Sequence, residues 1–418
     1  MRKLILATSL LAPAAAYAGG YAIPDENART LALSQSDLAD QTGAEAILIN
    51  PAGMAGQIGL DVSASLEWLD NRTDYSDPNL GTSSLLSHAN TPPAGAVSFG
   101  DVLPNDMMWA AGIGFHVPYG GALNWPDGWQ GQEYVRTVDQ KIYQMTAGAA
   151  FQPLPYLSIG AAYVRYQVTE ELHQAVNFVD HYGDAGIGMS GGSSSFMLAA
   201  QGKLPWIPLQ LAVSFKYKGS TQIDGNAHFT DVPPAFSTTL QDQSVTEQIA
   251  IPSEIHAGAA YEVIPNLSVM FTFTNEFWSI YHSDTFVGST GFTVNVPRDY
   301  NDAQVYRLGA EWAHVPFWSP LTLRIGALRS ISQQPTATLS PSLTDGDSWA
   351  VSVGAGYEII PDLRIDLGYQ HAFFDTVTAS GIDTLPGTYK TQVDLLSLGV
   401  NWRFDLLGRT SSNDPTQK

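Results

Sequence analysis

The sequence predicts an all-β protein, a 14-stranded antiparallel transmembrane β-barrel whose lumen holds an N-terminal plug, or hatch, of short helices. Three observations lead to this prediction. The chain begins with an export leader, apolar and polar residues alternate along most of its length, and the connections between alternating segments are short and long in turn.

Residues 1–18 have the pattern of a cleaved signal peptide. A basic start at Arg2 and Lys3 is followed by an apolar run and ends in small residues at Ala16 and Ala18. The apolar run is too short to cross a bilayer as a helix, so we expect cleavage after Ala18 and export of the remainder.

The composition excludes several classes of function. There is no cysteine, so disulfides, cysteine-ligated metals and cysteine nucleophiles are excluded. The chain has 40 acidic and 19 basic residues, a net charge of -21, which repels phosphate backbones and argues against nucleic-acid binding. After the leader, no apolar run is long enough for a transmembrane helix, so a membrane-spanning form must be a closed barrel.

Period-two alternation marks the strands. Near the C-terminus, Leu396, Leu398 and Val400 share one face, and Ser397 and Gly399 share the other. One apolar and one polar face suit a barrel wall between lipid and lumen, and they also suit a soluble sandwich. The connections decide between these two folds.

The alternating segments give a count of fourteen strands, and bacterial single-chain barrels have an even number. The predicted strands are 57–69, 93–102, 107–118, 138–152, 156–170, 193–204, 207–219, 244–262, 266–282, 301–314, 320–331, 346–359, 362–378 and 389–404.

The connections between these strands sort by length. Short turns contain Pro155, Pro205, Pro265 and Pro361. They alternate with long polar loops, predicted at 70–92, 119–137, 171–192, 220–243, 283–300, 332–345 and 379–388. Short periplasmic turns and long extracellular loops are typical of outer-membrane barrels, whereas a sandwich has no reason to sort its loops by end.

Two segments lie outside the barrel, which is predicted to span 57–404. Residues 19–56 contain two short helical stretches with apolar residues such as Leu31 and Ile47, which favours folding into the lumen as a plug. Residues 405–418 are polar and are expected to form a disordered periplasmic tail.

Several short motifs occur in a specific order along the mature chain. They are Asn50-Pro51-Ala52-Gly53-Met54, Gly112-Ile113-Gly114-Phe115, Pro118-Tyr119-Gly120, Trp129 to Gly131, Ile251-Pro252-Ser253-Glu254, Phe277-Trp278-Ser279, Tyr306-Arg307-Leu308-Gly309 and Asp366-Leu367-Gly368-Tyr369. In this order the sequence resembles the FadL/TodX (OMPP1) family of outer-membrane transporters for long-chain fatty acids and other hydrophobic compounds. The resemblance covers nearly all of the mature chain.

The resemblance implies a monomer in the bacterial outer membrane, surrounded by its lipids and lipopolysaccharide, with a lumen closed by a hatch at Asn50, Pro51 and Ala52. Ligand is expected to pass from the extracellular loops to a hydrophobic pocket and to leave sideways at a kinked third strand. The residues of that kink are Phe115, His116, Val117, Pro118, Tyr119 and Gly120. Proline and glycine weaken a sheet edge, although a plain strand-to-loop turn also explains them.

The ligand class stays open between fatty acids and neutral hydrocarbons. The family's basic ligand-binding position corresponds to Arg298, with Trp129 as a second candidate contact. The partner of that basic position corresponds to Glu170, where the charge is reversed, which weakens the case for capture of a carboxylate. No cofactor and no metal are expected.

Enzymatic motifs are set aside, and the protein is predicted not to be an enzyme. Residues 186–191 and 188–192 match G-x-G-x-x-G and G-x-S-x-G but fall in a predicted loop without the required strand and helix. His173, His181 and Asp184 do not have the spacing of a metal site. A general porin and an outer-membrane lipase remain the alternative functions, and a surface adhesin role is compatible with transport.

Overall fold

A computed structural model describes residues 22–23, 27–86, 89–291, 293–382 and 384–404. The predicted signal peptide, 1–18, and the predicted tail, 405–418, lie outside the described residues. No helix in the described part of the chain is long and apolar enough to cross a membrane.

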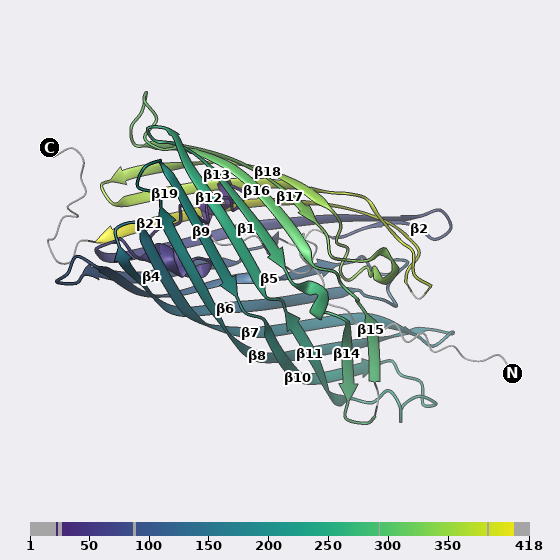
Figure 1. Ribbon diagram of the computed structural model, residues 1–418. Coiled ribbons are helices and arrows are strands. Elements are labelled where there is room, and N and C mark those ends of the chain that lie inside the picture. The colour runs from purple at the N-terminus through teal and green to yellow at the C-terminus, as the bar shows by residue number, and fades with distance from the viewer. Residues whose placement is uncertain (1–21, 24–26, 87–88, 292, 383, 405–418) are drawn as a thin grey trace.

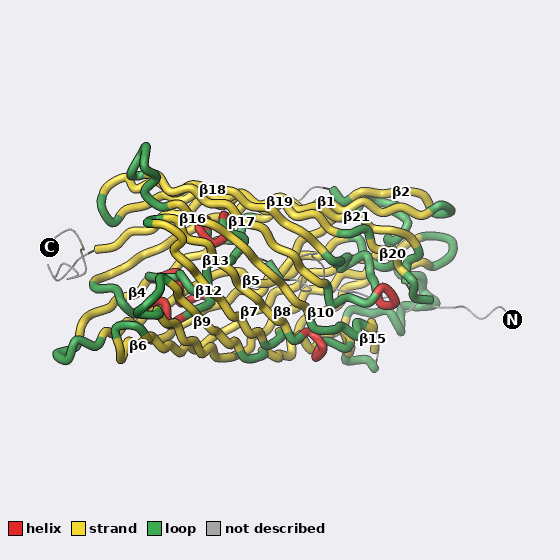
Figure 2. Tube along the Cα trace, turned by 45° about the horizontal axis from the view of Figure 1, so that its top comes forward, coloured by secondary structure: helices red, strands yellow, loops and turns green. Residues whose placement is uncertain are grey.

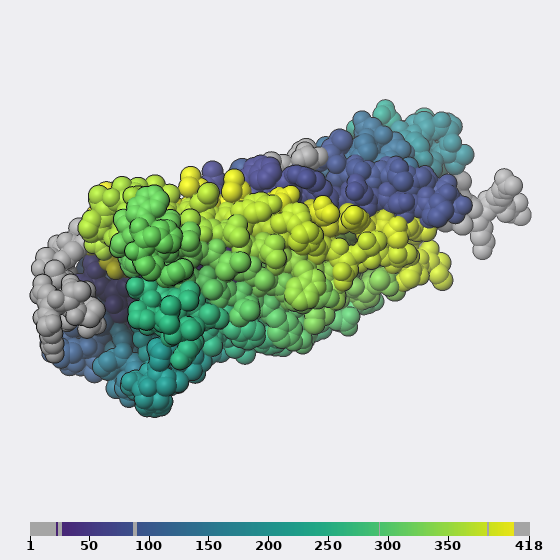
Figure 3. Space-filling model, turned by 90° about the horizontal axis from the view of Figure 1, so that it is seen from above, coloured from purple at the N-terminus to yellow at the C-terminus, as the bar shows by residue number. Residues whose placement is uncertain are grey.

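The protein is a closed, elongated 14-stranded antiparallel β-barrel with tilted strands (Figure 1). The ring is closed by β1 against β21, so that the first and last strands of the wall lie side by side in the space-filling view (Figure 3). In ring order the strands are β1 (Gly59–Asp77), β4 (Pro93–Val102), β5 (Met108–Asn124), β6 (Thr137–Leu154), β7 (Leu157–Asn177), β8 (Tyr182–Lys203), β9 (Leu209–Lys216), β12 (Glu254–Ile264), β13 (Leu267–Glu276), β16 (Ala303–Trp312), β17 (Leu321–Ile331), β18 (Ser348–Ile360), β19 (Leu363–Phe374) and β21 (Gly387–Phe404).

The remaining strands gather at the end of the barrel that carries the long connections. They are β2 (Gly81–Ser84), β3 (Ala89–Asn90), β10 (Gly219–Thr230), β11 (Gln243–Ile251), β14 (Ser283–Gly288), β15 (Thr293–Pro297) and β20 (Val377–Ala379), with the short helices η3 (Trp278–Ile280) and η4 (Thr336–Thr338) beside them. β8 pairs with β9 along one half and with β10 along the other, so β10 extends the wall beyond β9.

Several of the predicted loops are wrong in part. The predicted loop 70–92 contains the end of β1 together with β2 and β3, and the predicted loop 119–137 contains the end of β5. The predicted loop 171–192 is mostly strand, because β7 runs to Asn177 and β8 begins at Tyr182. The predicted loops 220–243 and 283–300 contain β10 and the hairpin of β14 and β15. These segments are rich in glycine, serine and polar residues with low strand propensity, and main-chain pairing with long neighbouring strands overrides that propensity.

The alternation of the wall is confirmed. Leu396, Leu398 and Val400 are 43%, 55% and 39% exposed on the outer face, whereas Ser397 between them is fully buried. An apolar outer face and a lumen of mixed polarity are what a wall in contact with lipid requires.

The N-terminal segment lies inside the barrel, where its helices appear in red behind the strands (Figure 2). We call residues 27–56 the hatch segment. It contains α1 (Ala28–Ala32), η1 (Ala44–Leu48) and η2 (Pro51–Met54). Asn27 caps α1 by accepting a hydrogen bond from the Thr30 backbone nitrogen at 2.9 Å.

Wall glycines allow the hatch segment to approach the strands. A Cβ atom added at Gly368 of β19 would lie 2.4 Å from the Ala28 carbonyl oxygen, and one at Gly160 of β7 would lie 2.4 Å from the Ala52 nitrogen. Backbone atoms cannot move aside as a flexible side chain can, so these glycines fix how closely the hatch segment packs.

We predict that Gly368→Leu displaces α1 and opens the lumen, because the new side chain must occupy space held by the Ala28 carbonyl. Conductance in planar bilayers should rise several-fold over the wild-type protein. Gly188→Leu is the matched control, since a Cβ there meets nothing within 4 Å. An unchanged conductance of a correctly folded Gly368→Leu barrel would contradict the prediction.

Candidate functional site: the lumenal cavity

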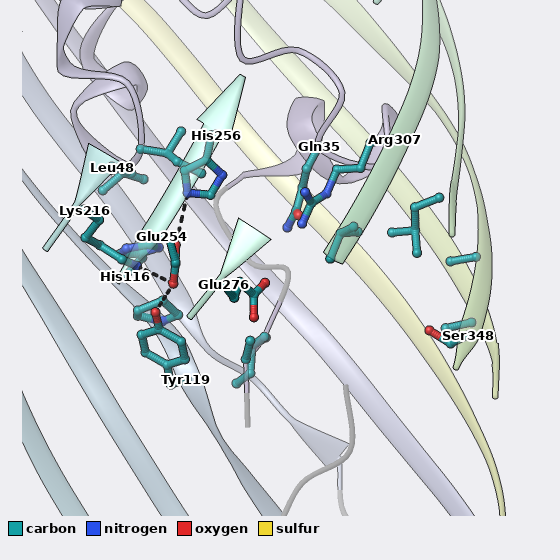
Figure 4. Close-up of a pocket in the computed structure, with 18 of the residues that line it drawn as sticks. Gln35, Leu48, His116, Tyr119, Lys216, Glu254, His256, Glu276, Arg307 and Ser348 are labelled. Carbon is teal, nitrogen blue, oxygen red and sulfur yellow. Dashed lines mark hydrogen bonds and ion pairs between the residues drawn. The ribbon is translucent and has the colours of Figure 1, made fainter. Parts of the chain in front are cut away.

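A cavity of about 80 Å³ lies between the hatch segment and the barrel wall (Figure 4). Its apolar lining is Ala22, Ile23, Leu48, Ile49, Pro118, Met197, Val305, Leu328, Ala350 and Ala372. Its polar lining is Gln35, His116, Tyr119, Lys216, Glu254, His256, Glu276, Arg307 and Ser348. This mixture of lining residues suits a small molecule that is apolar over most of its surface.

Glu254 is the centre of the polar side of the cavity. Its Oε1 lies 3.0 Å from Lys216 Nζ, its Oε2 lies 3.1 Å from His256 Nε2, and Tyr119 donates its hydroxyl hydrogen to the same carboxylate. Glu254 and His256 are two residues apart on β12, so both side chains point into the lumen. The Lys216 ammonium group is therefore already paired within the protein.

A chain of hydrogen bonds leads away from this centre. His256 Nδ1 is 2.9 Å from Thr274 Oγ1, and Arg307 Nη1 donates to the same oxygen at 2.5 Å. Glu254, His256 and Thr274 thus have the connectivity of a carboxylate, an imidazole and a hydroxyl nucleophile. Thr274 is fully buried and does not line the cavity, so a substrate there has no access to its hydroxyl.

Ion pairs join the hatch segment to the wall on its other side. Arg29 contacts Asp37 at 3.1 Å, Asp40 at 2.7 Å and Glu311 of β16 at 3.0 Å. Glu311 also lies 2.6 Å from Arg324 of β17. Removing one partner of such a buried group leaves an uncompensated charge, so the network holds the hatch segment in place.

The predicted hatch residues lie at a close contact between the hatch segment and the wall. The Asn50 side-chain nitrogen donates to the Leu38 carbonyl oxygen and to Gln201 Oε1, each at 2.8 Å. Pro51 begins η2, and the Ala52 nitrogen lies against Gly160. The amide of Asn50 therefore ties two parts of the hatch segment to β8.

The predicted third strand is β5, and its pairing is irregular where the sequence motif lies. The ladder between β4 and β5 reaches Gly95↔Phe115, and the register with β6 shifts between His116 and Tyr119. The strand then continues to Asn124, so the predicted end of the strand at 118 and the loop from 119 are wrong. Gly120 has a φ angle of +147°, which glycine can adopt because it has no Cβ atom. Pairing with β6 continues on both sides of Pro118.

The N-terminal residues 22–23 lie along this irregular part of β5. Ala22 forms a β-bridge with Tyr119, and the Ile23 nitrogen donates to the Pro118 carbonyl oxygen at 2.7 Å. They occupy a stretch of β5 beyond its pairing with β4.

An outer recess lies on the other side of the same strand. It has about 1270 Å³ of open space and is lined by Ser63, 93–97, 113–115, 145–147, Tyr163 and Arg165. Phe115 lines this recess, whereas the next residue, His116, lines the lumenal cavity. Only the thickness of β5 separates the two spaces.

Arg298 and Trp129 do not line the cavity. Arg298 is fully buried in the loops, where its Nε and Nη2 atoms each lie 2.8 Å from Asp284 Oδ2. Glu170 is also buried and accepts a hydrogen bond from Gln140 at 2.6 Å. Trp129 stacks on Trp125 with ring centroids 4.1 Å apart and donates its indole hydrogen to the Val135 carbonyl. The positive charge of Arg298 is therefore paired with the carboxylate of Asp284.

The motifs set aside in the sequence lie in regular structure. Residues 186–192 belong to β8, so their assignment to a flexible loop is wrong, and no helix follows them. His173 Nδ1 is 3.2 Å from Asp184, while His181 bonds to Asp180. Throughout the described ranges, no three His, Asp or Glu side chains are grouped to hold a metal ion.

Sequence reasoning missed the polar cluster of the cavity. Lys216, Glu254 and Glu276 end three different strands, β9, β12 and β13, and only the barrel register brings them together. The available signal was a set of charged residues at lumen-facing positions of strands that alternate elsewhere with apolar residues.

The sequence matches a protein-family model. The sequence model of the family described as outer membrane protein transport protein (OMPP1/FadL/TodX) matches residues 9–203 and 207–404. No curated protein matches the sequence.

Two solved structures have a similar fold. A Pseudomonas aeruginosa FadL homologue has 17% sequence identity and a TM-score of 0.80, with 92% of this chain and 100% of that chain covered. The P. putida toluene transporter TodX has 15% identity and a TM-score of 0.67, with 93% and 99% covered.

A pH dependence of the hatch follows from Glu45 in η1. Burial raises the pKa of this carboxyl to about 7, against the opposing effect of Arg364 and Arg29, while Asp366 and Asp37 add to the rise. When the hatch segment is seated, the Glu45 carboxyl keeps its proton up to about pH 7. When the hatch segment is displaced, the same carboxyl releases its proton above its ordinary pKa of 4.5. Protonation of Glu45 therefore stabilises the seated hatch segment by up to about 3 kcal/mol. This stabilisation is fully present below pH 4.5 and is lost as the pH rises to 7.

We predict that leak conductance rises between pH 5 and pH 8, and that Glu45→Gln removes most of this rise because its side chain does not ionise. Planar-bilayer recordings over that range provide the measurement. A wild-type leak that does not change with pH would show that Glu45 does not control seating.

Proposed function

The chain belongs to the OMPP1/FadL/TodX family of outer membrane transport proteins, and we propose that it takes up uncharged hydrophobic molecules in preference to fatty acids. Family membership makes it an outer-membrane channel for hydrophobic compounds. The preference for uncharged ligands is our proposal and does not follow from family membership. It is carried by one observation, the pairing of Lys216 in the cavity and of Arg298 in the loops with acidic side chains.

A carboxylate ligand needs a cation that is free to receive it. Lys216 already pairs with Glu254, and Arg298 with Asp284. A fatty acid that bound to Lys216 or Arg298 would have to displace the buried carboxylate already there, and the displaced group would be left without its partner at a cost of several kcal/mol. A neutral ligand carries no such cost.

The filled lumen supports uptake through a plugged barrel over a general porin. The hatch segment is bonded to the wall by Arg29 and Asn50. A lipase is also less well supported, because the hydroxyl next to the Glu254–His256 pair belongs to the inaccessible Thr274.

The geometry around β5 supports a lateral exit. Beyond Phe115 the strand is no longer paired with β4, and residues 22–23 lie along it instead. Movement of this short N-terminal stretch would join the lumenal cavity to the outer recess without breaking a long ladder. Ligand would then enter the hydrocarbon layer of the membrane directly.

Matched ligands test the substrate class. We expect the detergent-purified protein to bind toluene saturably and oleate at least tenfold more weakly, as measured by native mass spectrometry. Asp284→Asn should raise oleate affinity about tenfold, because Arg298 then regains a net positive charge. Tighter binding of oleate than of toluene by the wild-type protein would reassign it to fatty-acid uptake, and binding of neither would overturn the transporter proposal.

An engineered disulfide tests the exit. The chain has no cysteine, so Ala94→Cys with His116→Cys introduces one pair just beyond the last β4–β5 pair, Gly95↔Phe115. Oxidation should abolish toluene uptake by cells, and reduction should restore uptake, with toluene binding compared between the oxidised and reduced forms of this same variant and expected to be equal. The control is Val97→Cys with Ile113→Cys, which are opposed where the ladder is already complete. Full uptake by the oxidised test pair would exclude an exit at this position.

A further inference from the structure

We infer that the preferred ligand of the lumenal cavity is an apolar molecule with one neutral hydrogen-bonding group, such as an alkylphenol, whose hydroxyl binds at Glu276 and Gln35. This inference rests on the proposed function and narrows its substrate class. It is based on hydrogen-bonding groups that face the cavity and that receive no partner from the residues the structure describes.

Glu276 at the end of β13 offers half of its carboxyl group to the cavity. Its Oε2 accepts a hydrogen bond from Trp278 Nε1 at 2.7 Å. Its Oε1 has no donor among the residues that the structure describes, although the side chain is only 5% exposed. The side chain points into the cavity between Tyr119 and Arg307 (Figure 4).

Gln35 brings a second such group from the hatch segment. Ser34 and Gln35 have φ angles of 50° and 58°, a backbone region that residues other than glycine rarely adopt. In this conformation the Gln35 side chain reaches the cavity beside Arg307, opposite His256 (Figure 4). Within the described part of the chain its amide forms no side-chain hydrogen bond, so both its donor and its acceptor are available.

The charges around these groups select a neutral ligand. Lys216 and Arg307 face the cavity together with the carboxyl groups of Glu254 and Glu276. A ligand carboxylate would meet the two carboxyl groups, and a ligand ammonium group would meet the two cations. Either charged ligand would also pay the cost of losing water in a buried space.

A plain hydrocarbon fits the cavity less well than a hydroxylated one. It would cover Glu276 Oε1 and the Gln35 amide without giving them partners, and a buried polar group without a partner is unfavourable. A hydroxyl group can donate to Glu276 and accept from Gln35. Its apolar body would then contact Ile49, Val305 and Leu328 on the apolar side of the cavity.

Three ligands of one skeleton test this inference on the detergent-purified full chain: 4-butylphenol, butylbenzene and 4-butylbenzoate. Isothermal titration should show 4-butylphenol binding about tenfold more tightly than butylbenzene, with 4-butylbenzoate the weakest. Glu276→Leu should remove this tenfold preference without weakening butylbenzene, whereas Glu276→Gln, which keeps a hydrogen-bonding group, should retain most of it. Gln35→Ala should reduce the preference by a smaller factor.

Ser194→Ala, on the outer face beside Tyr163, is the matched control and should change none of the three affinities. Equal binding of 4-butylphenol and butylbenzene to the wild-type protein would overturn the inference and leave the proposed function standing. Tightest binding of 4-butylbenzoate would overturn both the inference and the preference for uncharged ligands. Binding of none would overturn the transporter proposal. The wild-type comparison decides the matter even where Glu276→Leu fails to fold.

Discussion

A lipid bilayer offers no hydrogen bonds to the backbone, and this constraint governs the rest of the structure. The sheet must close on itself, and it does so through the pairing of β1 with β21 from Leu60↔Phe404 to Ser76↔Thr388. Closure by a single chain removes both edges of the sheet. It also divides every strand into a lipid face and a lumen face, which is why leucine and valine alternate with serine and glycine along β21.

Closing fourteen strands creates a lumen that side chains of the wall alone do not fill. The hatch segment fills it, and its attachment uses two kinds of contact. Glycines such as Gly160 and Gly368 allow backbone to approach backbone, and the ion pairs of Arg29 with Glu311 and its neighbours fix the position. The cavity that remains is therefore bounded by hatch on one side and wall on the other, so ligand binding and hatch position share the same residues.

Backbone pairing between neighbouring wall strands is interrupted where we propose the lateral exit. Pro118 has no backbone hydrogen to donate, and β5 loses its β4 partner beyond Phe115. Ala22 and Ile23 pair there instead. A short strand segment is easier to displace than a long ladder, so a wall built this way can be sealed at rest and still provide a lateral path, as we propose.

The sequence by itself determined what depends on local period and composition. Alternation located all fourteen wall strands, although it joined β11 and β12 into one predicted strand, 244–262. Proline turns located one end of the barrel, and the apolar residues of 19–56 indicated a plug. Alternation did not predict β10 or the first half of β8. Glycine and serine give these segments a low strand propensity, and pairing with neighbouring strands makes them strands. The pairing of Arg298 with Asp284 and the gathering of Lys216, Glu254 and Glu276 were decided only by the tertiary structure, because strand register and barrel closure set those contacts and neither has a signal within a single strand.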